Sequence, residues 1–442
     1  MSLVVRTDAG RVRGAAHSGL FSFKGIPFAA PPEGELRFGA PARPKKWDGV
    51  RDAFAFATAA PQRPLAPGAP PLWSPGDGLD CLALNVWTPD PGAAGLPVMV
   101  WLHGGGWLIG GTAMPGYDAT VLAGHGVVVV TVGYRLGFEG FGHVPGAPGN
   151  RGLRDQIAAL EWVRANIAAF GGDPGNVTVF GQSAGAASIA LLLSSTRGLF
   201  RRAIAQSVPD GYHSVEEAGA VTGRLAEKAG VAPTREGLAA LPPEAFLEVP
   251  GDVGPVVDGD LVTGPPWESL GGKDVDLICG FTHEEYRLYP RGGELAAMDK
   301  AAAYRAAHPE TSDPELFTML MSDMLFRMPS TWVAEAHAAS GGRTWLYDFA
   351  WRGPEFGACH TVDVPFVFGN GDTRMAARVL GSPPPADFAP LSKRMRDAWT
   401  SFAATGDPGW PRFEAGSRVT RVWDTEPSDG PYPLDASREI WS

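Results

Sequence analysis

The chain has 442 residues, of which 44% are hydrophobic and 19% are charged. This composition is that of an ordinary soluble globular protein. The length alone suggests two or three domains, although large α/β enzymes often reach this length as one domain. The formal net charge of -11 argues against nucleic acid as a partner, because the phosphate backbone attracts basic patches.

Three cysteines, Cys81, Cys279 and Cys359, are too few for a disulfide framework and are odd in number. A reducing compartment suits such a chain best. The first residues, 1–14, lack the apolar core of a secretory signal, and no segment approaches the roughly 20 apolar residues of a membrane span. We therefore expect a cytoplasmic protein with no membrane partner, and a monomer as the simplest state.

Five apolar runs predict buried strands. The run at 96–105 ends in glycines, and the run at 126–135 is β-branched at nearly every position. That composition is expected of a parallel strand that is covered on both faces. The other runs lie at 177–181, 275–281 and 344–351.

A helix is predicted between the second and third of these strands. Its apolar residues recur at spacings of three and four, which places them on one helix face: Leu153, Ile157, Leu160, Val163, Ile167 and Phe170. A second helical pattern begins after Gly185. Strand, helix and strand in this order predict a right-handed crossover. The expected fold class is α/β, with a mostly parallel central sheet and helices on both faces.

The turn Gly-Gln-Ser-Ala-Gly at 181–185 joins the third strand to the second helix. A Gly-x-Ser-x-Gly turn forces its serine into a strained backbone conformation and lifts the hydroxyl clear of the sheet. Only glycine fits at Gly181 and Gly185, because larger side chains would collide with the neighbouring strand and helix. The alternative is a tight turn with an incidental serine. The strand before and the helix after favour Ser183 as a nucleophile.

A serine nucleophile needs a base, and the base needs an orienting carboxylate. In this strand–turn–helix arrangement the chain order is serine, acid, histidine. The histidines after Ser183 are His213, His283, His308, His337 and His360. His337 lies in a helical run and is expected to face solvent. His360 follows a predicted strand in a loop that could overhang the sheet, which favours it as the base.

The acid is expected at the end of another strand. Glu284 and Glu285 follow the strand at 275–281, and the residues alone leave the choice between them open. An acidic pair in contact with solvent is the alternative.

Backbone donors for an oxyanion are expected where a strand ends in glycines. The segment at 103–107, His-Gly-Gly-Gly-Trp, leaves the strand at 96–105, and glycines let N–H groups approach a substrate oxygen closely. A phosphate-binding loop is the alternative, but the Lys-Ser/Thr pair of that motif is missing. His103 is expected to be structural. No His-x-x-x-His or paired-cysteine pattern appears, so neither a metal nor a cofactor is expected.

Together these motifs resemble the type-B carboxylesterase/lipase family of α/β-hydrolases, which includes bacterial p-nitrobenzyl-type esterases and cholinesterases. The resemblance extends over nearly the whole chain. Its segments, in order, lie at 23–49, 80–89, 98–107, 149–186, 254–262, 280–286 and 360–369.

The resemblance implies a role for individual residues. It makes Ser183 the nucleophile, Glu285 the acid of the triad and His360 the base. It assigns the oxyanion donors and a supporting serine to the following positions: the N–H groups of Gly105, Gly106 and Ala184, and the side chain of Ser207. It implies a small-molecule ester as the substrate and no metal or cofactor.

Several positions depart from the family pattern. Leu79 replaces a glutamate that usually precedes Asp-Cys-Leu, so an ion pair with Arg37 is expected to be lost. Val208 and Tyr286 stand where the family has glycine. The chain is also shorter than most members. We expect a single α/β-hydrolase domain over 1–442 with a shortened helical cap over about 209–343, and therefore a more open site.

The expected function is a serine hydrolase that cleaves small to medium uncharged carboxylic esters through an acyl-enzyme intermediate. An acyltransferase or a carbamate-cleaving enzyme with the same triad is an alternative. A non-catalytic binding protein of the cholinesterase type is disfavoured, because such members lose triad residues and all three are present here.

Overall fold

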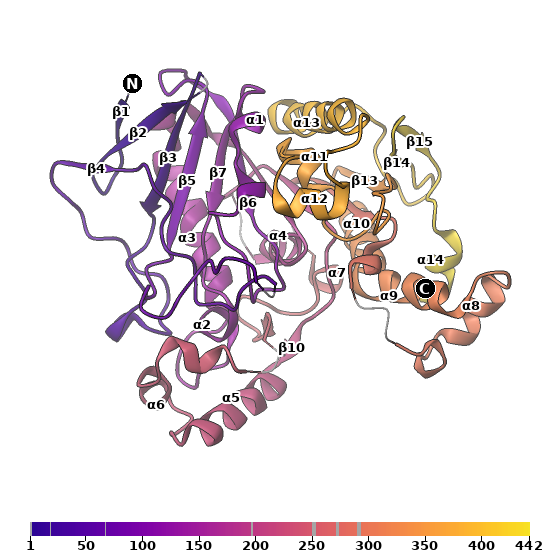
Figure 1. Ribbon diagram of the computed structural model, residues 1–442, viewed down its shortest axis with the longest axis horizontal. Coiled ribbons are helices and arrows are strands. Elements are labelled where there is room, and N and C mark those ends of the chain that lie inside the picture. The colour runs from indigo at the N-terminus through magenta and orange to yellow at the C-terminus, as the bar shows by residue number, and fades with distance from the viewer. Residues whose placement is uncertain are drawn as a thin grey trace.

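A computed structural model describes residues 2–17, 19–66, 68–195, 198–249, 253–270, 274–289 and 293–442. Within these residues the core is a 13-stranded sheet in the order β1–β2–β3–β5–β7–β6–β8–β9–β12–β13–β14–β15, with β4 beside β2. Figure 1 shows β1, β2, β3, β5, β7 and β6 side by side in the left half of the view, with α11, α12 and α13 to their right.

The middle of the sheet is parallel, as the sequence predicts. Its strands are β7 (Val128–Val132), β6 (Leu96–Leu102), β8 (Gly172–Gln182), β9 (Arg202–Gln206), β12 (Asp276–Thr282) and β13 (Thr344–Phe349). Because the carboxyl ends of parallel strands meet at one edge, the loops that follow β6, β8 and β12 emerge on the same side.

Antiparallel strands extend the sheet at both ends. They include β1 (Ser2–Arg6), β2 (Arg11–His17), β3 (Leu20–Pro27), β5 (Ala83–Thr88) and β15 (Ser428–Gly430), which pairs with β14 (Thr420–Trp423). The apolar runs did not indicate β2 and β3, because both strands are only partly buried and carry glycines, so neither reads as a continuous apolar run.

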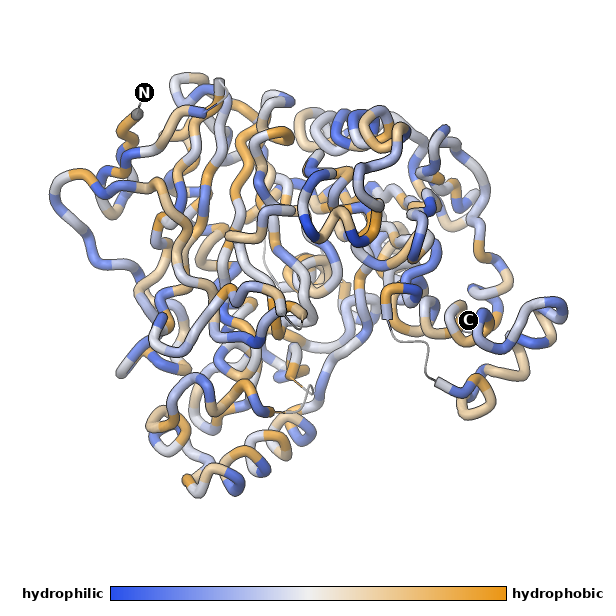
Figure 2. Tube along the Cα trace, viewed as in Figure 1, coloured by the Kyte–Doolittle hydropathy of each residue, from blue (hydrophilic) through white to orange (hydrophobic). Residues whose placement is uncertain are grey.

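Alternating side chains of β6 build a core on each face of the sheet. Val98, Val100 and Leu102 belong to the core formed with α3 (Arg151–Asn166) and α4 (Ala184–Ser195). Met99 and Trp101 belong to the core formed with α11 (Val364–Phe368) and α13 (Phe388–Thr405). In Figure 2 the strands β6 and β7 are coloured mainly as hydrophobic, which fits a sheet that is covered on both faces.

The predicted helix at 153–170 is present as α3, which continues as a 3-10 turn over Ile167–Phe170. The expectation that His337 faces solvent is wrong. His337 is fully buried in α10 (Met328–Ala339), and its Nδ1 lies 2.7 Å from Thr344 Oγ1. The helix packs on β12 and β13, so its histidine points into the protein.

In Figure 1, four helices of the predicted cap form two separate groups, one at the lower left and one at the right of the view. One group holds α5 (Val215–Ala229) and α6 (Arg235–Ala239), and the other holds α8 (Ala301–Ala307) and α9 (Asp313–Ser322). Residues 250–252, 271–273 and 290–292 of that predicted cap lie outside the described residues. The shortened cap remains a prediction.

Shorter elements complete the fold. They are β4 (Val50–Asp52), β10 (His213–Ser214), β11 (Val256–Val257), α1 (Thr120–Ala123), α2 (Gly137–Phe141), α7 (Pro266–Ser269), α12 (Arg374–Leu380) and α14 (Asp435–Trp441).

Arg37 has an ion-pair partner that the sequence did not indicate. Its Nη2 lies 2.5 Å from Oε1 of Glu139 in α2, and its Nη1 donates to the carbonyls of Ala239 and Leu241 at 3.0 and 2.6 Å. Leu79 provides no carboxylate for Arg37, as expected, but Glu139 provides one. The buried guanidinium therefore joins α2 to the end of α6.

The substitution Arg37→Met should lower the free energy of unfolding by about 3–5 kcal/mol, because it leaves the Glu139 carboxylate buried without its partner. The double variant R37M/E139Q should recover part of that loss, since no ionised group is then buried alone. Urea unfolding of both proteins measures the difference. A double variant as unstable as R37M would contradict this explanation.

Candidate active site

The turn at Ser183 has the strained geometry that the sequence predicts. Ser183 lies between β8 and α4 with φ of 56°, in the left-handed region, and its N–H donates to the carbonyl of Gln206 at 2.8 Å. A methyl group at Gly185 would lie 2.0 Å from Leu102 O, and one at Gly181 would lie 2.7 Å from the same oxygen. Both glycines are therefore required by the close approach of β6.

Glu285 and His360 are joined at the carboxyl edge of the sheet. His360 Nδ1 lies 2.5 Å from Glu285 Oε2, and both side chains are almost completely buried. The backbone N–H of His360 also donates to the backbone carbonyl of Glu285 at 3.0 Å. The other carboxylate oxygen, Oε1, accepts from the Thr282 N–H at 2.8 Å. These bonds fix the acid and turn the imidazole so that Nε2 faces away from it.

Glu284 faces a different set of partners. Its Oε1 lies 2.9 Å from Arg287 and 2.8 Å from Arg352, and its Oε2 accepts from the Ala358 N–H at 2.9 Å. Two cations therefore neutralise Glu284. The residues alone left open whether Glu284 or Glu285 is the acid. In the structure, Glu285 is the carboxylate beside the imidazole.

Aromatic rings that the sequence did not indicate enclose the imidazole of His360. The ring centroid of Phe326 lies 4.2 Å from that of His360, and the Tyr289 centroid lies 5.9 Å away. Phe326 belongs to a π-helical turn, Asp323–Arg327, that interrupts the passage from α9 to α10. No periodicity marks such a turn in a sequence, although π-turns occur frequently at functional sites.

The π-helical turn is also tied to the acid loop. Arg327 Nε lies 2.6 Å from Asp323 Oδ1, and both side chains are buried. Arg327 Nη1 donates to the His283 carbonyl at 2.7 Å, two residues before Glu285. The buried ion pair therefore positions Phe326 and the Glu285 loop together.

The nucleophile–base hydrogen bond is not formed in this structure. Within the described residues, the Ser183 hydroxyl makes no hydrogen bond to His360, and His360 Nε2 instead lies 3.0 Å from the amide nitrogen of Gln182. Because Gln182 and Ser183 are consecutive, all three predicted triad residues lie in one cluster. Gln182 is a residue of the site that the sequence reasoning did not single out.

The glycines after β6 line the Ser183 turn. A methyl group at Gly104 would lie 3.1 Å from Ser183 Cβ, and one at Gly105 would lie 1.9 Å from Ile109 O. Gly105 and Gly106 have φ of 115° and 61°. Their N–H groups make no hydrogen bond within the part of the chain that the structure describes. The Ala184 N–H lies at the first position of α4, where it lacks an intrahelical acceptor.

Ser207 lies in the left-handed region, with φ of 58° and a buried side chain whose Oγ has no hydrogen-bond partner among the described residues. Its N–H donates to the Gly280 carbonyl at 2.7 Å, which joins the ends of β9 and β12. The neighbouring Gln206 donates to Asp363 Oδ2 at 2.8 Å. Burial, with a further contribution from the charge of Glu285, raises the pKa of Asp363 to about 6.

His103 has the surroundings of a structural residue, as expected. Burial lowers its pKa to about 4, and its ring stacks on Tyr134 at a centroid distance of 4.5 Å. Its Nδ1 lies 2.8 Å from the Gly104 carbonyl. A neutral, stacked imidazole holds the start of the glycine loop.

The described residues contain no group of three or more His, Cys, Asp or Glu side chains that could hold a metal ion. None of the described helices is long and apolar enough to cross a bilayer.

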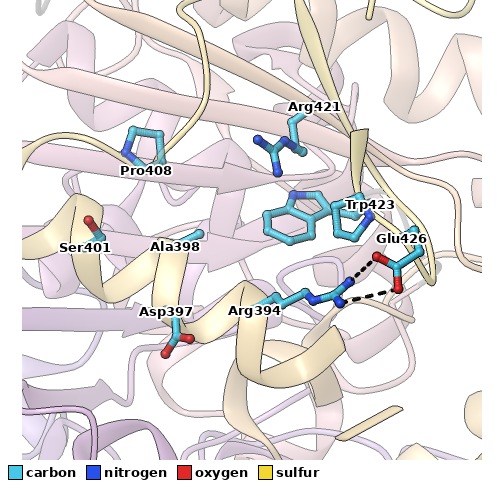
Figure 3. Close-up of a pocket in the computed structure, with 9 residues that line it drawn as sticks. Arg394, Asp397, Ala398, Ser401, Pro408, Arg421, Trp423 and Glu426 are labelled. Carbon is cyan, nitrogen blue, oxygen red and sulfur yellow. Dashed lines mark hydrogen bonds and ion pairs between the residues drawn. The ribbon is translucent and has the colours of Figure 1, made fainter. Parts of the chain in front are cut away.

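A cavity of about 500 Å³ lies between α13 and the β14–β15 hairpin (Figure 3). Arg394 and Arg421 both line it, but Arg394 is paired with Glu426 at 2.9 Å and Arg421 with Asp429 at 2.6 Å. The Arg421 guanidinium also lies over the Trp423 ring. None of the triad residues lines this cavity, and both of its cations are neutralised.

Comparison with known proteins identifies relatives over nearly the full chain. The model of the carboxylesterase family matches residues 1–301 and 291–432. The para-nitrobenzyl esterase of Bacillus subtilis (strain 168) is 34% identical, over 96% of this chain and 95% of that protein. The phenmedipham hydrolase of Pseudarthrobacter oxydans is 35% identical, over 95% of this chain and 94% of that protein.

Solved structures agree with the sequence relatives. The carboxylesterase EST55 of Geobacillus stearothermophilus superposes with a TM-score of 0.88 and 35% identity, over 99% of this chain and all of that chain. A structure of PNB esterase gives a TM-score of 0.90 and 32% identity, over all of this chain and 99% of that chain. The α/β-hydrolase fold expected from the sequence is confirmed.

The substitution Gly185→Ala should destabilise the protein by at least about 2 kcal/mol, because its methyl group would overlap the Leu102 carbonyl. The matched control is Gly223→Ala in α5, where a methyl group meets nothing within 4 Å. There the better helix propensity of alanine should add about 0.5–1 kcal/mol. Thermal unfolding measures both changes, and equal stability of the two variants would contradict the close approach of β6.

Proposed function

The chain belongs to the carboxylesterase family, and from that premise we propose that Ser183, His360 and Glu285 are the catalytic triad of a serine ester hydrolase. The protein is a carboxylesterase. The observation that carries the triad proposal is the 2.5 Å hydrogen bond between buried Glu285 and His360, at the same edge of the sheet as the strained Ser183. The proposed substrates are small to medium uncharged esters.

In the proposed acylation, Ser183 Oγ attacks the ester carbonyl carbon while His360 Nε2 takes the hydroxyl proton. Glu285 keeps Nδ1 protonated and stabilises the imidazolium that forms. The negative oxygen of the tetrahedral intermediate would accept from the N–H groups of Gly105, Gly106 and Ala184. His360 then protonates the leaving alcohol, and the carbonyl re-forms as an acyl-serine ester.

In the proposed deacylation, water attacks the acyl-serine while His360 Nε2 takes its proton. Collapse of the second tetrahedral intermediate breaks the bond to Ser183 Oγ, and His360 returns a proton to that oxygen. The carboxylic acid leaves and the enzyme regains its starting state. Ser207 contributes by holding the ends of β9 and β12 beside this machinery.

A cavity of about 190 Å³, which is lined by residues that follow the glycine loop but by none of the triad residues, is compatible with uncharged substrates. Leu108 and Ile109, which directly follow the loop, line it together with Phe138, Phe246 and Val253. Glu139 and Arg63 also line it, but their charges are paired with Arg37 and Glu248, respectively. A mostly apolar cavity favours an uncharged acyl or alcohol group over an ionic one.

We propose that the whole chain is one catalytic domain, which the family match over 1–301 and 291–432 supports. The shortened cap and an open site are part of the same proposal. The cytoplasm is the proposed location, because the cysteines are free and buried. The net charge of -11 supports a small-molecule partner without nucleic acid, and a monomer is the proposed state.

The substitution Ser183→Ala should lower kcat on p-nitrophenyl butyrate by about six orders of magnitude, because the triad acts as a unit. The matched control is Ser195→Ala at the end of α4, where the hydroxyl donates to the Leu191 carbonyl at 3.0 Å. That variant should keep wild-type activity. The release of nitrophenol, measured by absorbance, gives kcat for each variant. A decrease in kcat of less than tenfold in S183A would rule out Ser183 as the nucleophile.

A panel of p-nitrophenyl esters of increasing acyl length, together with an aryl carbamate, tests the substrate class. The relative named phenmedipham hydrolase is the reason to include the carbamate. We expect short and medium acyl esters to give the highest kcat/KM. Product analysis with a competing alcohol separates hydrolysis from acyl transfer: free acid as the main product supports the hydrolase, and ester exchange as the main product contradicts it.

A further inference from the structure

The side chain of Glu284 joins the loop of the proposed acid to the loop of the proposed base. Glu284 directly precedes Glu285, and Ala358 lies two residues before His360. Glu284 Oε2 accepts from the Ala358 N–H at 2.9 Å. The Glu284 N–H donates to the Ala358 carbonyl at 2.8 Å, and the backbone N–H of His360 donates to the Glu285 carbonyl at 3.0 Å. These three bonds join the two loops beside the Glu285–His360 bond itself.

The other carboxylate oxygen of Glu284 is held by two cations. Oε1 accepts from Arg352 Nη2 at 2.8 Å, and Arg352 lies between β13 and His360. Oε1 also lies 2.9 Å from Arg287 Nε, which makes no hydrogen bond among the described residues, so that Arg287 acts on Glu284 by its charge. The Glu284 side chain is only 11% exposed, whereas that of Arg352 is 65% exposed. An exposed ion pair contributes little, so the bond to the buried Ala358 N–H is the stronger attachment.

A glycine in the base loop leaves room for the Glu284 carboxylate. A methyl group at Gly357 would lie 2.1 Å from Glu284 Oε2, and Gly357 has φ of 62°, in the left-handed region. Gly353 and Gly357 exchange two backbone hydrogen bonds of 3.1 Å. The tight turn that results directs the Ala358 N–H at the carboxylate.

These contacts distinguish Glu284 from a surface ion pair. A carboxylate that bonded only arginines would hold side chains, whereas Glu284 holds the backbone on both sides of the acid–base bond. The 2.5 Å separation of Glu285 Oε2 and His360 Nδ1 depends on where these two loops lie. A displacement of about 1 Å in a catalytic arrangement can cost about a hundredfold in rate.

We propose that Glu284 is a positioning residue of the triad, which holds the loops of Glu285 and His360 at the spacing that their hydrogen bond needs. It acts through these two side chains and makes no contact with the ester. This inference rests on the proposed function, in which Glu285 orients His360.

The substitution Glu284→Gln tests this role, with Glu315→Gln as the matched control. Both residues are carboxylates paired with Arg287, so each variant removes one negative charge beside the same arginine. Only Glu284 also bonds Ala358 and Arg352, and an amide has a single accepting oxygen for these two donors. We expect kcat on p-nitrophenyl butyrate to fall about tenfold or more in E284Q, with KM within about twofold of wild type. E315Q should keep the wild-type kcat.

Proton NMR measures the positioning directly. The proton in a short Glu285–His360 hydrogen bond resonates far downfield. This signal should move upfield or broaden in E284Q and stay unchanged in E315Q. A purely structural role predicts a lower melting temperature in E284Q with the wild-type kcat and an unmoved signal, and that result would overturn the proposal. Equal losses of kcat in E284Q and E315Q would overturn it as well.

Glu284→Asp decides the matter where E284Q does not fold. The aspartate keeps the charge, but it is one methylene shorter and cannot reach both Ala358 and Arg352 from the same backbone position. We expect a lower kcat and a displaced downfield signal in E284D. Wild-type values of both would contradict the proposal.

The proposed function is checked separately on the wild-type enzyme. Absence of p-nitrophenyl butyrate hydrolysis by wild type would remove the esterase itself, whereas the NMR comparison needs no activity. Hydrolysis by wild type combined with equal kcat values in E284Q and E315Q would remove only the role of Glu284.

Discussion

A buried hydrogen bond between Glu285 and His360 joins segments that are 75 residues apart. Both side chains are withdrawn from water, and burial of a charged carboxylate is costly unless hydrogen bonds satisfy it. Glu285 meets that requirement with the His360 ring and the Thr282 N–H. The parallel sheet makes this possible, because β12, which precedes Glu285, and β13, which precedes His360, end at the same edge. The strained turn at Ser183 then brings its hydroxyl to the same place.

Other charged side chains near this hydrogen bond are paired with one another. Glu284 is neutralised by two arginines, so that Glu285 alone faces the imidazole. Arg327 is paired with Asp323 and also holds the His283 carbonyl, which fixes the loop that carries Glu285. The π-helical turn between them places Phe326 against the ring. Packing and charge therefore position the base before a substrate arrives.

The sequence predicts much of this arrangement because its strongest signals are local. The apolar runs indicate the central strands, and the Gly-x-Ser-x-Gly turn indicates the conformation of Ser183, which φ of 56° confirms. Contacts between distant segments are harder to predict. His337 lies in a run that reads as exposed, yet α10 packs on the sheet and buries it. The Arg37–Glu139 pair, Phe326 and Gln182 likewise depend on which segments meet in the fold, and no local pattern marks them.

The central claim is that Ser183 is the nucleophile that His360 and Glu285 activate. Treatment with a fluorophosphonate, followed by peptide mass spectrometry, measures which side chain reacts. We predict one adduct per chain, on the peptide that contains Ser183, with loss of esterase activity in proportion to labelling. Loss of activity while Ser183 stays unmodified, or an adduct on another residue, would contradict the claim.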